Sequence, residues 1–131
     1  MAGITDLQEL LESMSPELQA GEFVFCTVAG QLAEYVGLSP ISAFQESEGL
    51  TLVLTRKKAD SAGLDYEAVF RMITLTVHSS LEAVGLTAAI ATKLAEQGIS
   101  ANVIAAYYHD HVFVQSEKAD EALIALQSFS S

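Results

Sequence analysis

The chain has 131 residues, the usual size of one domain, and folding at this length can bury a sizeable hydrophobic core. Its 17 acidic and 6 basic residues give a formal net charge of −11, which disfavours nucleic acids and anionic membranes as partners. No stretch approaches the ~20 apolar residues of a membrane span, and the N-terminus lacks a basic region followed by an apolar run. We therefore expect a cytoplasmic protein that binds neither nucleic acid nor membrane.

Cys26 is the single cysteine of the chain, so an internal disulfide and a cysteine-based metal cluster are excluded. A lone cysteine fits a reducing compartment. It lies in an apolar segment, and we interpret it as a buried strand residue rather than a reactive thiol.

Hydrophobic periodicity and turn residues predict an α+β chain. Alternating or β-branched segments indicate strands, apolar residues at helical spacing indicate helices, and glycines mark several ends. Thr5 and Gln8 make a plausible capping box at the first helix. The predicted elements are, in order, a helix over 4–14, a strand over 22–29, a hairpin of strands 41–46 and 50–55, a helix over 56–62, a strand over 68–78, a helix from 86 that ends by Gly98, a hairpin of strands 102–107 and 111–115, and a helix over 119–126.

The two halves of the chain look alike. Each contains a hairpin followed by a helix, at 41–62 and at 102–128, with an offset of about 60 residues. No Pro- or Gly-rich linker separates them, so we expect one compact unit composed of halves 1–66 and 67–131. Strands separated by helices on one face predict a layered sandwich.

The stretch 72–115 carries a recognisable pattern. Glu82 lies three positions before Gly85, which opens a predicted helix, and Asn102 begins the next strand after the pair Gly98-Ile99. This pattern resembles the ACT domain, and the whole chain is similar to small bacterial tandem-ACT proteins. The N-terminal half fits the family less closely, through residues 22–27 and 48–54.

The resemblance implies a ferredoxin-like fold of two βαββαβ units, interleaved, with antiparallel sheets and helices on one face. It also implies regulatory binding of amino acids. Val84 stands where the family commonly has proline, and no sixth strand follows the last predicted helix. We expect the N-terminal half to supply this closing strand to the C-terminal unit.

The turn at Gly85 is the principal candidate site. Unpaired amides at a helix N-terminus hold carboxylates well, and glycine permits close approach of a ligand to the backbone. Val84, Gly85, Leu86 and Thr87 are therefore candidate ligand-binding residues. The alternative is that Gly85 only enables a tight turn and that Thr87 satisfies the free amides.

The strand that follows the helix supplies further candidates. Asn102 could present a donor and an acceptor to the ammonium and carboxylate of an amino acid, or could bond its own backbone as a turn residue. In the manner of the family, Val103 and Ile104 would add main-chain contacts, while their side chains belong to the core.

Histidine, serine and tyrosine side chains suggest a catalytic pair and a metal site, but each has a simpler structural interpretation. His78 beside Ser79 suggests a base and a nucleophile, but no orienting carboxylate or nucleophile elbow accompanies them. We interpret Ser79 with Glu82 as a capping box, and His78 as a residue that borders the ligand pocket.

The segment 109–111 resembles a metal site, yet a polar loop tip explains it, and we expect no metal. We expect one of Tyr107 and Tyr108 in the core and the other on the surface.

These patterns predict a regulatory or sensor protein rather than an enzyme. The chain shows no phosphate loop, dinucleotide fingerprint or zinc spacing, and we expect neither a catalytic residue nor a cofactor. The preferred function is binding of a small ligand, an amino acid or similar metabolite, by a homodimer. The alternative is a protein-interaction or assembly module without a small-molecule ligand, which recruits its partner through a sheet edge or helix.

Overall fold

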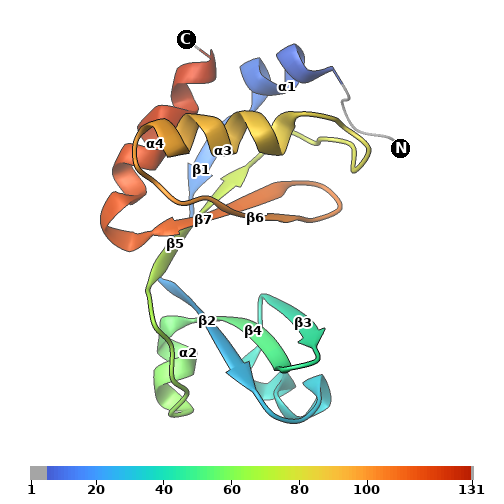
Figure 1. The fold of residues 1–131 in the computed structure, drawn as a ribbon, viewed down its shortest axis with the longest axis vertical. Helices are drawn as coiled ribbons and strands as arrows, with labels where there is room; N and C mark the ends of the chain where they lie inside the picture. The colour runs from blue at the N-terminus through green and yellow to red at the C-terminus, as the bar shows by residue number, and fades with distance from the viewer. Residues whose placement is uncertain (1–5, 131) are drawn as a thin grey trace. The chain divides into compact units, whose positions relative to one another are not determined.

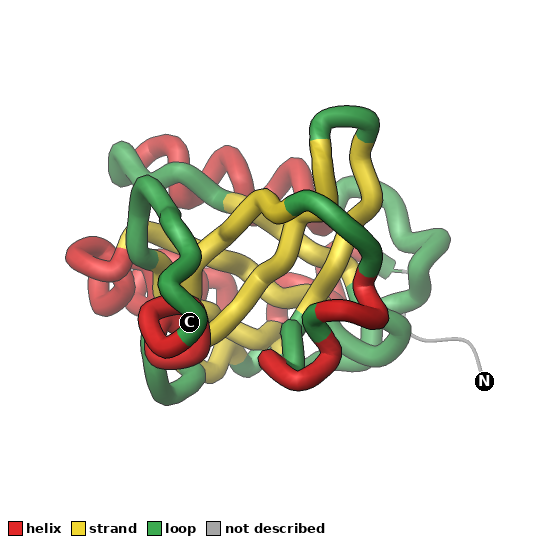
Figure 2. Tube along the Cα trace, turned by 90° about the horizontal axis from the view of Figure 1, so that it is seen from below, coloured by secondary structure: helices red, strands yellow, loops and turns green. Residues whose placement is uncertain are grey.

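The computed structural model describes residues 6–130 and divides the chain into two compact units. Unit 2 is the continuous segment Gly21–Phe70, and unit 1 combines the residues before Gly21 with those after Phe70. The chain therefore passes between the units twice, once after Ala20 and once after Phe70. Most connections between helices and strands within each unit are short loops, drawn green in Figure 2.

Unit 1 is built around a sheet with the strand order β1-β5-β7-β6. β6 and β7 form an antiparallel hairpin in which Asn102 pairs with Phe113. Figure 1 shows the helices α3 and α4 of this unit beside its strands. Its strands and helices are α1 (Leu7–Ser13), β1 (Pro16–Leu18), β5 (Phe70–Leu75), α3 (Leu86–Glu96), β6 (Asn102–Ala105), β7 (Asp110–Gln115) and α4 (Ala119–Gln127).

The core of unit 1 lies between one face of this sheet and the helices α1, α3 and α4. Alternate residues of a strand point to the same face, so Ile73 and Leu75 of β5 and Val112 and Val114 of β7 meet the helices together. The helices contribute residues at helical spacing to the same buried cluster, namely Leu10, Met14, Leu86, Ile90, Leu94, Ala119, Ala122 and Leu126. The expected arrangement of helices on one face is thus present.

The N-terminal strand β1 closes the sheet of unit 1. It pairs antiparallel with β5, and Pro16, Glu17 and Leu18 lie opposite Leu75, Thr74 and Ile73. The amide of Gln19 extends this pairing by donating to the carbonyl of Met72 at 2.8 Å. The prediction that the N-terminal half supplies the missing strand is confirmed, although the three-residue strand itself was not foreseen.

Unit 2 has the strand order β3-β4-β2, and Phe70 at the start of β5 pairs with Phe23 of β2. Its core contains buried residues of β2 and β4, among them Val24, Cys26, Leu52 and Leu54, together with Ala59 of the helix α2. Its elements are β2 (Phe23–Val28), the 3-10 turns η1 (Leu32–Glu34) and η2 (Val36–Leu38), β3 (Ser42–Glu46), β4 (Gly49–Thr55) and α2 (Arg56–Ser61). Two short 3-10 turns, and no α-helix, therefore connect β2 to β3 in unit 2.

Several local predictions need correction. Thr5 lies outside the described residues, and the N-cap of α1 is Asp6, whose carboxylate accepts a hydrogen bond from the amide of Glu9 at 2.9 Å. β5 covers Phe70–Leu75, whereas the apolar pattern predicted a strand over 68–78. Its backbone leaves the ladder at Thr76, whose amide and hydroxyl both bond the carbonyl of Ser15.

Candidate functional site

The turn at Gly85 opens the helix α3 in unit 1. Gly85 has φ = 95°, a left-handed conformation that side chains disfavour, and its carbonyl accepts the first helical bond from Ala89 at 2.9 Å. Among the described residues, no side chain accepts a hydrogen bond from the amides of Leu86, Thr87 or Ala88. The positive end of α3 is therefore uncapped by the described side chains.

The helix α1 restricts access to this turn. A Cβ added to Gly85 would lie 3.1 Å from Cδ2 of Leu7, and Leu86 is buried in the core. Val84 and Thr87 are exposed on either side of this covered glycine, Val84 by 83%. The exposed approach to the turn therefore lies along Val84, Thr87 and Ala88.

The predicted contacts on β6 are partly used by the protein itself. The side-chain amide of Asn102 donates to the carbonyl of Phe113 at 3.3 Å, across the hairpin. Val103 and Ile104 are half-buried, and they pair with Val112 and His111 of β7. The Oδ1 acceptor of Asn102 and its second N–H donor are left for another partner.

A buried hydrogen bond ties the loop between β5 and α3 to the β6–β7 hairpin. Ser79 Oγ donates to Asp110 Oδ2 at 2.9 Å, and both residues are more than nine-tenths buried. The predicted capping box of Ser79 with Glu82 is therefore wrong: the amide of Glu82 donates to Ser80 Oγ instead, and α3 begins only at Leu86. Asp110 lies in β7 rather than at an exposed loop tip. Sequence reasoning missed this pair because its partners are 31 positions apart.

Three aromatic rings gather where this loop meets the hairpin. His78 lies with its ring centroid 5.1 Å from that of Tyr108 and 6.2 Å from that of Tyr107. Tyr107 and Tyr108 contact each other edge to face, with centroids 5.0 Å apart. Both tyrosines are exposed, by 60% and 62%, so the predicted division into a core and a surface tyrosine is wrong. We call His78, Tyr107 and Tyr108 the ring cluster.

His111 is held on the sheet by a hydrogen bond between its Nδ1 and Thr74 Oγ1 at 3.0 Å. Burial, with a smaller repulsion from His109, lowers the pKa of His111, although Asp110 acts in the opposite direction. Within residues 6–130, no group of three His, Cys, Asp or Glu side chains is placed to hold a metal ion.

The corresponding turn of unit 2, after β2, is filled by the protein itself. Gly30 there also has a left-handed φ, of 100°. The carboxylate of Glu34 accepts a hydrogen bond from the amide of Gln31 at 2.8 Å, and a Cβ on Gly30 would collide with it. This turn therefore holds a carboxylate that comes from its own 3-10 turn.

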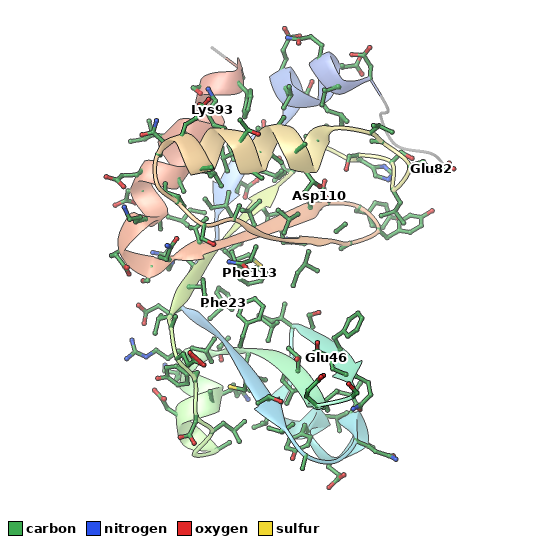
Figure 3. The ribbon with its side chains drawn as sticks, in the orientation of Figure 1. Phe23, Glu46, Glu82, Lys93, Asp110 and Phe113 are labelled. Atoms are coloured by element: carbon green, nitrogen blue, oxygen red, sulfur yellow. The ribbon has the colours of Figure 1, made fainter. Side chains whose placement is uncertain are left out.

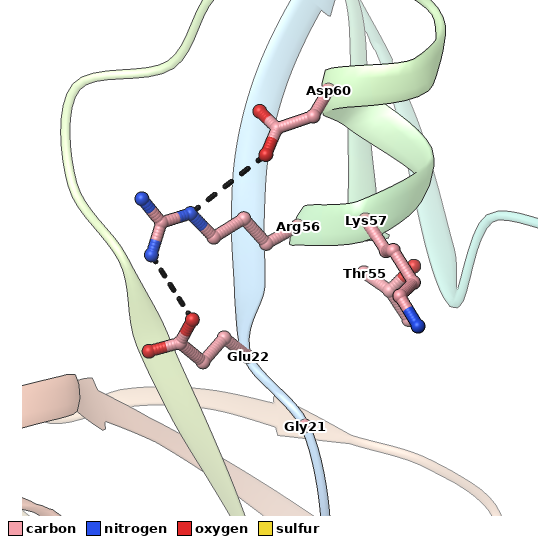
Figure 4. Close-up of a pocket in the computed structure, with 6 residues that line it drawn as sticks. All are labelled: Gly21, Glu22, Thr55, Arg56, Lys57 and Asp60. Atoms are coloured by element: carbon pink, nitrogen blue, oxygen red, sulfur yellow. Dashed lines mark hydrogen bonds and ion pairs between the residues drawn. The ribbon is translucent and has the colours of Figure 1, made fainter.

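Unit 2 also has an open hollow of about 510 Å³ around the start of α2 (Figure 4). Arg56 lies along its wall and pairs with Glu22 at 3.0 Å and with Asp60 at 3.9 Å. Hydrogen bonds from Arg56 to Tyr66 and to Glu22 raise its pKa, so the guanidinium remains charged but is already occupied. Sequence reasoning did not indicate this hollow, whose residues come from Gly21–Glu22 and from the β4–α2 junction.

Comparison with protein families matches ACT domains to both halves of the chain, at residues 2–71 and 67–128. The chain belongs to the ACT domain family. A comparison with curated protein sequences found no match. The α+β fold of this ACT protein is accordingly the one that its sequence predicted.

Solved structures similar to this ACT protein include one with high sequence identity and others with low sequence identity. A protein of unknown function from Vibrio cholerae, described as a possible transport protein, is 66% identical, with a TM-score of 0.88 over 95% of this chain and 96% of that one. A protein from Agrobacterium tumefaciens is 14% identical, with a TM-score of 0.69 and 88% and 87% of the chains covered. The regulatory subunit of aspartate kinase from Thermus thermophilus is 12% identical, with a TM-score of 0.66 and 88% and 97% covered. At these low identities, the proteins from Agrobacterium tumefaciens and Thermus thermophilus show only that they have the same fold as this chain.

Among residues 6–130, the helices of this ACT protein are all too short or too polar to cross a bilayer. ACT-family membership is consistent with a regulatory, ligand-binding protein.

Proposed function

We propose that this ACT protein is a regulatory sensor that binds a free amino acid or similar metabolite at the Gly85 turn of unit 1. The observation that carries the proposal is the start of α3, where no described side chain caps the first amides. Such a terminus attracts an anion through its free N–H groups and its dipole. The ligand carboxylate would occupy this position.

The contrast between the two units supports a carboxylate as the bound group. In unit 2 the turn after β2 already accommodates one, the side chain of Glu34 on the amide of Gln31. In unit 1 the residue four positions after the glycine is Ala89, which has no carboxylate to offer. A ligand would therefore supply to unit 1 the group that Glu34 supplies to unit 2.

The remaining predicted residues would orient the ligand. Asn102 retains Oδ1 as an acceptor for an ammonium group, and Val103 and Ile104 would contribute main-chain groups. His78 would border the site from the loop that leads to Gly85. Leu7 would have to yield for close approach to the glycine, so ligand binding would be coupled to the position of α1.

The proposed mechanism is a population shift without catalysis. A ligand that binds one arrangement of unit 1 more tightly than another raises the population of that arrangement. The output would pass to another protein, and we propose a cytoplasmic homodimer as the acting species.

A thermal-unfolding panel of the twenty amino acids and common nucleotides tests the proposal. A ligand present at one hundred times its Kd stabilises the folded state by about 2.7 kcal/mol, which raises Tm by several degrees. We expect one or a few related amino acids to do so. A panel in which none raises Tm would contradict the proposed function.

The variant Thr87→Asp locates the site. A carboxylate at this exposed first-turn position would compete with that of the ligand, while its interaction with the helix dipole stabilises α3 by about 0.3–1 kcal/mol. We expect Tm of the free protein to be maintained and the ligand response to be lost. Thr87→Asn, which is similar in shape but neutral, is the matched control and should respond. Gly85→Val is less suitable, because the positive φ and Leu7 both oppose a side chain there.

The alternative, an assembly module without a small ligand, is favoured by exposed apolar side chains in unit 2. Phe44 on the edge strand β3 is 67% exposed, and Leu32, Val36 and Ile41 are also exposed. Unpaired edge strands with apolar residues recruit partners. If Phe44→Lys converts a dimer to a monomer in sedimentation while the ligand panel gives no response, assembly becomes the preferred function.

A further inference from the structure

We propose that the ring cluster of His78, Tyr107 and Tyr108 is a subsite for the cationic head of a small organic ligand, an ammonium or guanidinium group. The inference rests on the proposed function, because the loop that carries His78 leads directly to the Gly85 turn. It adds what that function leaves open, namely the chemical class of the ligand side chain.

The geometry of the ring cluster leaves aromatic faces available. Tyr107 and Tyr108 meet edge to face at 70°, so their ring planes are steeply inclined to each other, and both side chains are more than half exposed. The ring of His78 lies within 6.2 Å of both tyrosines by centroid. A cation is attracted to the negative face of an aromatic ring within about 6 Å of its centroid, and Tyr serves this purpose well.

Hydrogen bonds join the two segments that carry the rings of the cluster. The bond from Ser79 to Asp110 fixes the residue after His78 to the residue two positions after Tyr108. The carbonyl of His109 also accepts the amide of Ala106 at 3.0 Å, which closes the turn that presents both tyrosines. The cluster is therefore held in place before any ligand binds, which lowers the entropy cost of binding.

The charges around the ring cluster favour a cation. Residues 76–85 and 106–111 contain the acidic residues Glu82 and Asp110 and three histidines, but no Lys or Arg, whose side chains carry a permanent charge. Neither carboxylate has a cationic partner within 4 Å among the described residues. Figure 3 shows Glu82 at the outer edge of unit 1, on the loop that also carries His78.

Exposed aliphatic side chains lie between the ring cluster and the Gly85 turn in the sequence, where they could contact the apolar stem of a ligand. Leu81 and Val84 lie on the loop between His78 and Gly85 and are exposed by 65% and 83%. The methylene stem of a basic ligand can cover them while its head group contacts the rings. From His78 to Leu86 the loop thus leads from the ring cluster, past apolar side chains for a stem, to the amides for a carboxylate.

Three probes separate this subsite from the proposed carboxylate site. L-Arginine carries both charged ends, agmatine lacks the carboxylate, and L-citrulline has a neutral head of nearly the same shape. In heteronuclear NMR titrations, arginine and agmatine should shift the signals of His78, Tyr107 and Tyr108, whereas citrulline should leave them in place. Citrulline and arginine both carry the α-carboxylate, so both should shift the amide signals of Leu86, Thr87 and Ala88.

Variants of Tyr108 measure the contribution of its ring. Tyr108→Ala should weaken agmatine binding about threefold to thirtyfold, and Tyr108→Phe, which keeps the ring, should bind within about twofold of the natural protein. Ile124→Ala removes a similarly exposed apolar side chain from α4 and should change nothing. Unshifted core signals would confirm that each variant is folded.

The outcomes are distinguishable. If agmatine shifts no ring signal, if citrulline shifts these signals as strongly as arginine, or if Tyr108→Ala binds agmatine normally, the cation subsite is overturned. If agmatine contacts the rings but no amino acid of the panel affects Leu86–Ala88, the subsite stands and the proposed function fails. If amino acids shift only the turn amides, the proposed function stands without the subsite.

Discussion

Cys26 illustrates how burial sets the reactivity of one residue. It is 3% exposed in the core of unit 2, and burial, with a smaller repulsion from Asp65, raises the pKa of its thiol. We expect native protein at pH 8 to react with a thiol reagent at least about a hundredfold more slowly than protein unfolded in urea. A colorimetric thiol assay measures both rates. Comparable rates would show that Cys26 is accessible in the folded chain.

His111 makes the stability of unit 1 depend on pH. Its pKa is lowered in the folded state, so the unfolded chain takes up a proton first as the pH falls. The stabilising contribution is therefore complete above the ordinary pKa of about 6.5 and is lost as the pH falls through the lowered value. Urea midpoints between pH 7.5 and pH 5.5 measure this loss.

His111→Asn is the control for this prediction, because asparagine can bond Thr74 from nearly the same position but does not titrate. Its urea midpoint should fall less over the same pH interval. Equal slopes in the two proteins would assign the pH dependence to other groups.

Among the elements, the strand β1 is short, but we expect its pairing with β5 to contribute substantially to the stability of unit 1. The amide of Gln19 donates to Met72, and its carbonyl accepts a bond from the Arg71 side chain at 3.0 Å. Gln19→Pro removes the amide donor and should destabilise the protein by about 1–3 kcal/mol, whereas Gln19→Ala should cost less than about 0.5 kcal/mol. Urea unfolding measures both. Equal stabilities would mean that the pairing at Gln19 is unimportant.

The sequence predicted the longer elements and failed on the short ones. The hairpins over β3–β4 and β6–β7 and the helices α2, α3 and α4 have enough residues for a period to be recognised. β1 has three residues and begins with Pro16, and the turns at Leu32–Glu34 and Val36–Leu38 are equally short. Their positions depend on tertiary contacts that no local pattern encodes.

The candidate site was predictable only where chemistry is local. Gly85 opens a helix, as its place between a strand and an apolar stripe indicated. The cover by Leu7 and the Ser79–Asp110 bond join segments far apart in the sequence, so spacing could not reveal them. The exposure of both Tyr107 and Tyr108 was not foreseen because β6 ends at Ala105, two residues earlier than the alternation suggested.

For the whole molecule, the two units differ in how they depend on the chain. Unit 2 is continuous, whereas unit 1 needs both the residues before Gly21 and those after Phe70. Removal of residues 1–20 deletes β1, Leu10 and Met14, and should unfold unit 1 while unit 2 retains its fold. NMR signal dispersion of each unit in the shortened chain measures this. Loss of dispersion in both units, or in neither, would contradict the prediction.

The closing of unit 1 by β1 also imposes an order on biosynthesis. Residues 6–20 leave the ribosome before the rest of unit 1, and α4, which covers the same unit, is made about a hundred residues later, a delay of roughly 5–20 s at ordinary translation rates. Gly21–Phe70 can assemble during this interval. During this interval Leu10 and Met14, which are buried in the folded chain, remain uncovered, so the nascent segment 6–20 passes through a stage in which it is prone to aggregation.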